Sequence, residues 1–320
     1  MNYSILANIR LQCEAVASSS TWVKVDEYRL MQYASTLDLG ELRMTHSPDH
    51  HLLGRGDETL IYFLILDSLN FGSGYFPFLE KSSGFSGYFT VAQRLKAYCV
   101  DKGIPTPSSL LSMTAEDCGR IFGQPLANPH VSELMQLFSI ALNQLGRWII
   151  EEYDHDYLGF LKDADSVEAV LASLVDMKYF QDVAQYGRLL VPFYKRAQIL
   201  LQDMAVAEPN HRLMKFGDID SLTIFADNVL PYVLHSDGVL KYHGWLAQRI
   251  ENEELIGSGS FEEIELRACT VHAVELIKRA LEDRSIRVSS RQLDFCLWNR
   301  GQQLKKIIPF KRHRTRCVYY

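Results

Sequence analysis

The sequence contains few of the features that mark secreted, membrane-embedded or zinc-stabilised proteins. Its six cysteines are scattered along 320 residues without a C-x-x-C pair, so neither a disulfide framework nor a structural zinc site is indicated. No apolar run approaches the roughly 18 residues that span a bilayer, and the first residues lack the basic-then-apolar order of a signal peptide. We therefore expect a reduced, cytoplasmic protein that makes no contact with a membrane.

Positive charge is scarce as well. The formal net charge is −6 and the pI is about 5.9, which argues against a broad nucleic-acid-binding surface. Positive residues concentrate near the last residues, at Lys305, Lys306, Lys311, Arg312, Arg314 and Arg316. This basic stretch is a solvated end, an intramolecular clamp or a nucleic-acid contact. We favour the first two over the third. We expect no stable nucleic-acid partner.

Signatures of the common catalytic classes are missing too. There is no P-loop, no Gly-x-Ser-x-Gly elbow and no Cys–His arrangement of distinctive spacing. The glycines of residues 71–75 lack the surrounding βαβ pattern of a dinucleotide site. Residues 46–51 and 151–157 lack the helical histidine pair, or the second ligand cluster, of a metal site, so we interpret both as solvated surface. No metal or organic cofactor is expected.

Apolar residues at helical spacing are present along most of the chain. Helices are expected over residues 3–17, 26–36, 57–70, 89–100, 108–112, 114–122, 130–151, 156–161, 166–175, 193–207, 242–252, 261–283 and 289–304. Only short strands are expected, for example around residues 177–183. Because the sequence shows neither an internal repeat nor a convincing linker, we predict a single, mainly α-helical domain over residues 1–320.

An acidic residue precedes a proline at a point where a helix should break. Residues 218–225 have the pattern of a capped amphipathic helix, and the residues up to 234 are again apolar at helical spacing. Because Pro231 has no N–H, the carbonyl of Asp227, four residues back, loses its helical partner. The break is either a structural kink or a place where the Asp227 carboxylate, beside freed backbone, serves a site.

A cation stands at the expected start of another helix. Pro192 suits a first helical turn, and Lys195 then lies in that turn, where the helix dipole disfavours positive charge. Its partner is either an anion such as phosphate or, as we favour, a neighbouring carboxylate.

A carboxylate and a tryptophan share one face of the last expected helix. Ser289 and Gln292 fit a capping box that begins this helix. Asp294 and Trp298 are four residues apart, so they stack on one face at the edge of its apolar stripe. An acid in such surroundings is suited to a perturbed pKa. The alternative is a carboxylate paired with Arg287 or Arg291.

Several segments, taken in order, resemble the queuosine salvage protein family, the queuosine 5′-phosphate N-glycosylases. They are Leu69-Asn-Phe71, Ser86-Gly-Tyr-Phe89, Tyr194-Lys-Arg-Ala-Gln-Ile-Leu200, Leu222-Thr-Ile-Phe-Ala-Asp227, Gly259-Ser-Phe-Glu-Glu-Ile-Glu-Leu-Arg-Ala-Cys269, Asp294-Phe-Cys-Leu-Trp298 and His313-Arg-Thr-Arg-Cys-Val-Tyr-Tyr320. The resemblance runs from about residue 20 to the last residue. It implies a helical fold similar to the helix-hairpin-helix DNA glycosylases. It also implies hydrolysis of queuosine 5′-phosphate to ribose 5-phosphate and queuine, the base salvaged for tRNA modification.

The resemblance also implies roles for individual residues. Asp294 corresponds to the family's catalytic carboxylate, and Asp227 joins it as the second carboxylate of the site. The residues implied to bind substrate are Ser86, Gly87 and Tyr88 at the base, Phe225 beside the nucleoside, and Asp218, Lys195, Trp298 and Asn299. The small-molecule substrate is the expected partner, and the chain is expected to act as a monomer.

Two departures from the family pattern keep other functions open. Gly72-Ser-Gly74 stands where many members have an aromatic-rich sequence, and Asn299 stands where an aspartate is common. One alternative is a nucleosidase for another modified nucleotide. The other is a non-catalytic protein that binds a modified nucleoside or tRNA, which the net negative charge disfavours.

Overall fold

Helices make up most of the computed structural model, which describes residues 4–37, 42–162, 164–304 and 310–320. The mainly α-helical class predicted from the sequence is confirmed. Within the described residues, no helix is both long enough and apolar enough to cross a membrane.

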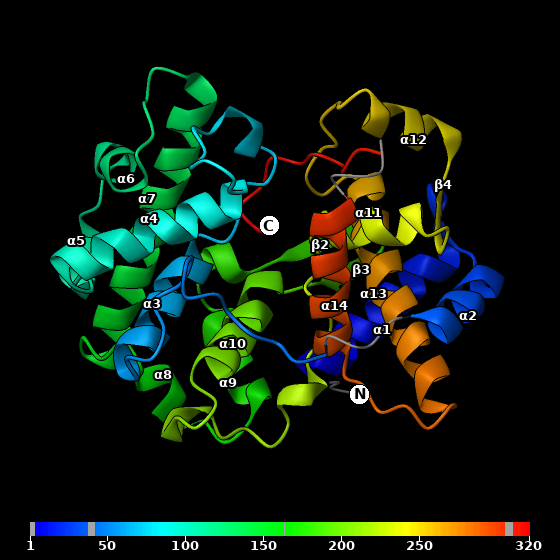
Figure 1. The fold of residues 1–320 in the computed structure, drawn as a ribbon, viewed down its shortest axis with the longest axis horizontal. Coiled ribbons are helices and arrows are strands. Elements are labelled where there is room, and N and C mark those ends of the chain that lie inside the picture. Colours follow the sequence, from blue (N-terminus) through cyan, green and yellow to red (C-terminus); the bar gives the residue numbers. More distant parts are fainter. Residues whose placement is uncertain (1–3, 38–41, 163, 305–309) are drawn as a thin grey trace.

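The helices lie in two groups that share one continuous set of buried apolar residues (Figure 1). The group on the left of the view contains α3 (Asp57–Ser68), α4 (Gly87–Lys102), α5 (Pro107–Leu111), α6 (Ala115–Phe122), α7 (Pro129–Tyr153), α8 (Gly159–Lys162), α9 (Val167–Leu174) and α10 (Lys195–Ala207). The group on the right contains α1 (Ile5–Ser19), α2 (Glu27–Thr36), α11 (Val229–Ser236), α12 (Gly244–Glu251), α13 (Phe261–Glu282) and α14 (Ser290–Leu304). The last residues cross between the two groups.

Short strands and single 3₁₀ turns connect the helices. Strand β1 (Val23–Val25) pairs antiparallel with β4 (Leu240–Tyr242), and β2 (Val183–Tyr186) forms a hairpin with β3 (Leu189–Pro192). The 3₁₀ turns are η1 (Phe76–Phe78), η2 (Lys178–Phe180), η3 (Arg212–Met214) and η4 (Ile219–Ser221). The strand expected around residues 177–183 is therefore mostly a 3₁₀ turn, and the strand lies just after it.

The helices that carry the candidate site begin at well-defined caps. Ser86 caps α4 through its side chain, which accepts a hydrogen bond from the Phe89 amide. At α14 the expected capping box is present in one direction, because the Gln292 side chain accepts from the Ser289 amide at 3.0 Å. These caps fix where the first turns of α4 and α14 face.

Two helix predictions differ from the structure, one in how the helix begins and the other along its whole length. Pro192 does not open α10 but ends strand β3, and Tyr194, at a φ of 47°, turns the chain so that the helix begins at Lys195. Residues 218–225 are not an amphipathic helix: η4 is a single turn, and residues 222–227, called the extended segment below, belong to neither a helix nor a strand.

The predicted proline kink is also wrong, because the helix begins after Asp227. Pro231 is the third residue of α11, and its missing N–H falls in the first turn, where amides have no helical partner in any case. The break therefore separates an extended segment from a new helix.

Candidate active site

The two helix groups enclose a cavity of about 1170 Å³. It is lined by the first turn of α4, one face of α10, one face of α14, the extended segment with the start of α11, and parts of residues 43–51 and 310–314. A cavity of this size holds a nucleotide-sized ligand.

Most of the residues singled out in the sequence meet in this cavity. Its lining includes Asp294, Asp227, Ser86, Gly87, Tyr88, Phe225, Lys195, Trp298 and Asn299. Among the described residues, Asp218 lies elsewhere: its two carboxylate oxygens each accept from the Val167 amide at 3.1 Å, at the start of α9. Asp218 thus serves a helix start and lies outside the cavity wall.

Asp227 caps the helix that follows it. Its Oδ1 accepts from the amides of Val229 at 2.7 Å and Leu230 at 3.2 Å. Burial raises the pKa of Asp227 above its ordinary value, while Lys195 and the two amides lower it. Two backbone amides thus fix the carboxylate of Asp227, which lines the cavity.

Asp294 is buried on α14 and bound to the extended segment. Its Oδ1 accepts from the Phe225 amide at 2.8 Å. Burial and the nearby Asp227 carboxylate raise the pKa of Asp294 well above its ordinary value. Arg291, considered as its partner, instead donates to Asp220 at 2.7 Å.

Trp298 stands one turn beyond Asp294 and forms an aromatic wall with α4. Its ring lies edge-on to Tyr88 and Phe89, with centroid separations of 6.4 and 5.8 Å. Beside this wall, Gly87 allows Phe76 of η1 to pack against the first turn of α4, since a Cβ there would lie 2.4 Å from Phe76 Cγ. The aromatic rings offer a flat apolar surface to a planar ligand.

The Lys195 ammonium bonds to Asn70, while the carboxylates favoured as its partners from the sequence act on it only through their charge. Its Nζ donates to the carbonyl of Asn70 at 3.2 Å and to Asn70 Oδ1 at 3.0 Å. Burial lowers the pKa of Lys195, and the carboxylates of Asp227, Asp67 and Asp203 raise it.

Two acidic residues of this cluster were missed in the sequence. Asp203 lines the cavity, and burial raises its pKa to about 7, an effect that Lys195 opposes. Asp67, behind it, has one oxygen bound to Asn70 and one buried oxygen without a hydrogen-bond partner among the described residues. Lys195, Ile199 and Asp203 follow one another at four-residue steps, and this spacing could have revealed that α10 presents both charges on one face.

The interpretation of residues 46–51 as solvated surface is wrong. His51 is buried and its Nε2 lies 3.2 Å from the Tyr88 hydroxyl, while His46 Nε2 lies 3.2 Å from the carbonyl of Asp203. Burial lowers the pKa of His46 to about 4 and that of His51 to about 3, so both rings are neutral at pH 7. Within the described part of the chain, no group of His, Cys, Asp or Glu is arranged to hold a metal ion.

The buried cluster around Lys195 has more carboxyl groups than cations, although further basic side chains line other parts of the cavity. Lys195 lowers the pKa of Asp67, Asp203, Asp227 and Asp294 alike, while Arg196 also lowers that of Asp67 and Arg312 that of Asp227. Such a cluster retains protons at neutral pH and releases them when a cation arrives. The site therefore favours ligands or transition states that carry positive charge.

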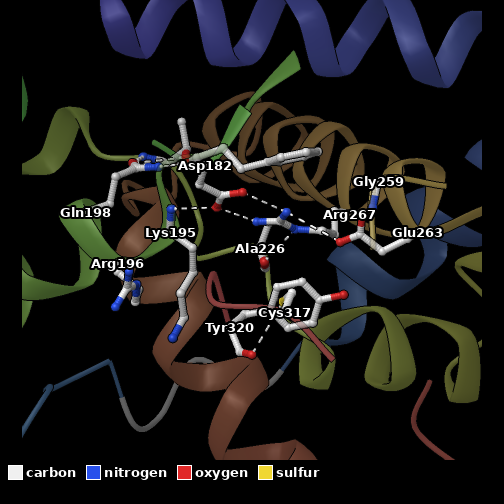
Figure 2. Close-up of polar contacts among 12 residues, drawn as sticks. Asp182, Lys195, Arg196, Gln198, Ala226, Gly259, Glu263, Arg267, Cys317 and Tyr320 are labelled. Carbon is white, nitrogen blue, oxygen red and sulfur yellow. Dashed lines mark hydrogen bonds and ion pairs between the residues drawn. The ribbon is translucent and has the colours of Figure 1, made fainter. Parts of the chain in front are cut away.

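A buried ion network supports the extended segment from behind (Figure 2). The Arg267 guanidinium of α13 donates to both oxygens of Asp182, at 2.9 and 2.6 Å, and to the carbonyl of Ala226 at 3.0 Å. Glu263 lies 3.4 Å from the same guanidinium. Through the Ala226 carbonyl, the network fixes the backbone directly before Asp227.

The chain is similar to proteins of one known family. The sequence profile of the queuosine salvage protein family matches residues 50–320. Proteins named queuosine 5′-phosphate N-glycosylase/hydrolase are similar to the chain: that of Sphaerobacter thermophilus is 34% identical over 267 residues, covering 81% of this chain and 80% of that protein. The Dictyostelium discoideum protein is 33% identical, with 82% and 78% covered, and the Mus musculus protein is 30% identical, with 85% of each covered.

Proposed function

The chain belongs to the queuosine salvage protein family, and on that premise we propose that it hydrolyses the N-glycosidic bond of queuosine 5′-phosphate. The products are queuine and ribose 5-phosphate. The observation that carries the proposal is the convergence of Asp294 and Asp227 in one cavity beside an aromatic wall.

The charge of the cavity suits this reaction. When the bond between C1′ and the base nitrogen breaks, its electrons leave with the base and positive charge develops on the ribose. A fixed carboxylate stabilises that charge, and water then adds its oxygen to C1′ and gives up one proton to the carboxylate pair. A 7-deazapurine has no N7 to protonate, so the departing base must receive a proton elsewhere.

Asp294 and Asp227 together supply the charge and a proton. Burial and the Asp227 carboxylate both raise the pKa of Asp294, so we assign the proton of the pair to Asp294 and the negative charge to Asp227. The ionised member of the pair faces the ribose cation, and the protonated member is a source of the proton that the base requires. Asp294, with the more strongly raised pKa, holds the proton before substrate binds.

The remaining lining residues are assigned to recognition. Tyr88, Phe225 and Trp298 stack against or beside the base, and Ser86, Gly87 and Asn299 lie at its edges. The queuine side chain carries an amine, which is a cation at neutral pH. Since Asp218 lies outside the cavity and Asp227 is assigned to the ribose, Asp203 is the carboxylate proposed to meet that amine.

The test is queuine release from queuosine 5′-phosphate, followed by chromatography. Asp294→Asn and Asp227→Asn, which keep the shape of the side chain, should each lower the rate by about 10²–10³-fold or more. Asp101→Asn removes an exposed carboxylate from α4 and should leave the rate unchanged. Undiminished release by Asp294→Asn would remove that residue from the catalytic role.

A second enzymatic function is kept because of one observation. Ser73, from the Gly72-Ser-Gly74 departure, lines the cavity and has a buried hydroxyl without a partner among the described residues. A panel of nucleoside 5′-phosphates decides between substrates, because a faster reaction with another base would assign the chain to that nucleotide. A purely binding protein would hold nucleotide or tRNA without turnover, and tRNA binding would weaken steeply with salt.

We also propose the finer features implied by the resemblance. They are a monomeric, cytoplasmic protein with a single domain over residues 1–320, no cofactor, no stable nucleic-acid partner, and a fold related to that of helix-hairpin-helix DNA glycosylases. Light scattering of the purified protein and superposition of a crystal structure on a DNA glycosylase test the first and last of these.

A further inference from the structure

Asp67 is a buried carboxyl group that the proposed reaction does not use. It lies in the last turn of α3 and is fully buried. Its Oδ1 accepts a hydrogen bond from Asn70 Nδ2 at 2.9 Å, and its buried Oδ2 has no partner among the described residues. Burying a carboxyl group with so few partners is costly, which indicates a role for Asp67 beyond the stability of α3.

Asn70 connects Asp67 to the cavity. The Asn70 amide donates to the Asp67 carbonyl at 3.4 Å, so the chain continues the helical turn and the two side chains meet across three residues. Asn70 lines the cavity, and its Oδ1 and carbonyl oxygen accept from Lys195 Nζ at 3.0 and 3.2 Å. Asp67, Asn70 and Lys195 thus form one chain of hydrogen bonds from the core to the site.

The side-chain amide of Asn70 serves Lys195 in one orientation only. The oxygen and nitrogen of an amide have nearly the same shape, but the oxygen accepts hydrogen bonds and the nitrogen donates them. Because Asp67 accepts from Nδ2, Oδ1 faces the ammonium. The reversed amide would set its N–H donors against those of Lys195. Loss of the Asp67 acceptor would therefore free the amide to turn and weaken its hold on Lys195.

The other cations that line the cavity do not take the place of Lys195. Three belong to the basic stretch near the last residues, namely Lys311, Arg312 and Arg314, while Lys305 and Lys306 lie outside the described residues. This stretch is bonded into the protein, as the predicted clamp would be, since Asn228 Nδ2 donates to the carbonyl of His313 at 3.2 Å. Arg312 lowers the pKa of Asp227, whereas Lys195 lowers the pKa of all four buried carboxyl groups. The position of Lys195 therefore influences the charge of the whole cluster.

Lys195 has a second place that the reaction must avoid. Figure 2 shows its side chain extending away from Asp182, which accepts from its backbone amide at 3.2 Å. Among the carboxylates, Asp227 has the largest effect on the pKa of Lys195. A lysine side chain is long and flexible, so an ammonium released from Asn70 would move to pair with Asp227. That pair would neutralise the charge assigned to the ribose cation.

We propose that Asp67 is a positioning residue, which acts through Asn70 to hold the Lys195 ammonium near the catalytic carboxyl groups without pairing with them. Asp67 does this as a hydrogen-bond acceptor, because burial raises its pKa well above the ordinary value and the group retains its proton at neutral pH. The role rests on the proposed function for the reaction that it serves. The charged and titratable groups around the ammonium are Arg196 and Asp203 of α10, Asp67 of α3, Asp227 before α11, and Asp294 of α14.

Two substitutions separate the acceptor from the charge. Asp67→Asn keeps an oxygen for Asn70 Nδ2 and should leave kcat for queuine release within about threefold of the unmodified value. Asp67→Leu has a similar volume but no acceptor, and it should lower kcat by about 10- to 100-fold with KM within about threefold, as expected for losing a hydrogen bond that positions a charged group. Ser68→Ala removes a buried hydroxyl that donates to the Leu64 carbonyl in the same turn, so it is the matched control and should change neither constant.

The pH dependence gives a readout that a loss of stability alone would not move. An ammonium that approaches Asp227 and Asp294 favours their ionised forms and lowers their pKa values. The fall of kcat/KM at high pH, where Asp294 loses its proton, should therefore begin at a lower pH in Asp67→Leu and at an unchanged pH in Asp67→Asn. A shift in both variants would assign the effect to the charge of Asp67, and this outcome, or a shift in neither, would overturn the positioning role.

Crystal structures of the variants test the position of Lys195 without substrate. In Asp67→Leu, Nζ should leave Asn70 and approach Asp227, whereas in Asp67→Asn it should stay. An ammonium still bonded to both Asn70 oxygens in Asp67→Leu would refute the proposal. If the unmodified protein releases no queuine, the proposed function fails, and the structures still decide whether Asp67 holds Lys195. Asp67→Ala, which removes the same acceptor with less bulk, gives the comparison if Asp67→Leu does not fold.

Discussion

Replacing Arg267 with methionine should strongly destabilise the protein. The guanidinium is 1% exposed and lies 3.9 Å from the centre of the Phe193 ring and 4.8 Å from that of Tyr320. Methionine fills much of the same volume but leaves the buried carboxylates of Asp182 and Glu263 without their cation.

The magnitude follows from the charges left behind. Removing one partner of a buried ion pair costs about 3–5 kcal/mol, because the other charge stays buried and uncompensated. Burial already raises the pKa of Glu263, and Arg267 lowers it, so the loss of Arg267 should raise that pKa further. The carbonyl of Ala226 also loses its donor, which should loosen the backbone before Asp227 and reduce activity.

Urea-induced unfolding at pH 7.5, followed by circular dichroism, measures this change. Arg188→Met, on an exposed turn of the β2–β3 hairpin, is the matched control and should not move the unfolding midpoint. The double substitution Arg267→Met with Asp182→Leu should recover part of the loss, since it removes a stranded charge. A loss below about 1 kcal/mol for Arg267→Met, or no recovery in the double variant, would refute the reasoning.

Three further predictions concern the site. Burial raises the pKa of Asp203 to about 7, so between about pH 4 and pH 7 the folded protein binds more protons than the unfolded chain. This group therefore lowers the free energy of unfolding as the pH rises through that range. Asp203→Asn should flatten this pH dependence and raise stability at pH 8, as measured by unfolding at several pH values. Gly74→Ala would place a Cβ 2.3 Å from the Thr315 carbonyl oxygen, so it should displace the backbone at Thr315, cost about 1–3 kcal/mol and weaken substrate binding. Gly244→Ala is the control, because the added Cβ meets no atom within 4 Å and Gly244 has no positive φ. Incubation with EDTA should leave queuine release unchanged, and a loss restored by added metal would contradict the cofactor-free proposal.

The helical character could be predicted from the sequence because it depends on local spacing. The long helix over residues 130–151, for example, is α7 (Pro129–Tyr153). Its apolar residues recur at helical intervals, and Pro129 and the Asn128 cap mark its start. Asp294 and Trp298 were likewise indicated by their four-residue spacing and capping box.

The segment before Asp227 could not be predicted, because its partners are distant in sequence. Its apolar residues fit a helix by spacing alone. Its backbone is instead satisfied by side chains: Gln198 accepts from the Thr223 amide, Asp294 from the Phe225 amide, and Arg267 donates to the Ala226 carbonyl. A segment with so many long-range bonds takes an extended form that local pattern cannot reveal.

The burial of the histidines was missed for a similar reason. His46 and His51 lie in a polar-looking stretch, but Phe63 of α3 stacks against both rings, and Tyr88 of α4 meets His51. Nothing within residues 46–51 shows that two helices from later in the chain cover them.

The extended segment that ends at Asp227 makes stability and turnover difficult to tune separately. It belongs to no helix or strand, and the side chains that bond to its backbone come from α10, α13 and α14. Asp294, one of these side chains, is also a proposed catalyst, so its protonation state and the position of Phe225 are linked. Selection for heat resistance should therefore leave Gln198, Arg267 and Asp294 unchanged and accumulate its substitutions elsewhere.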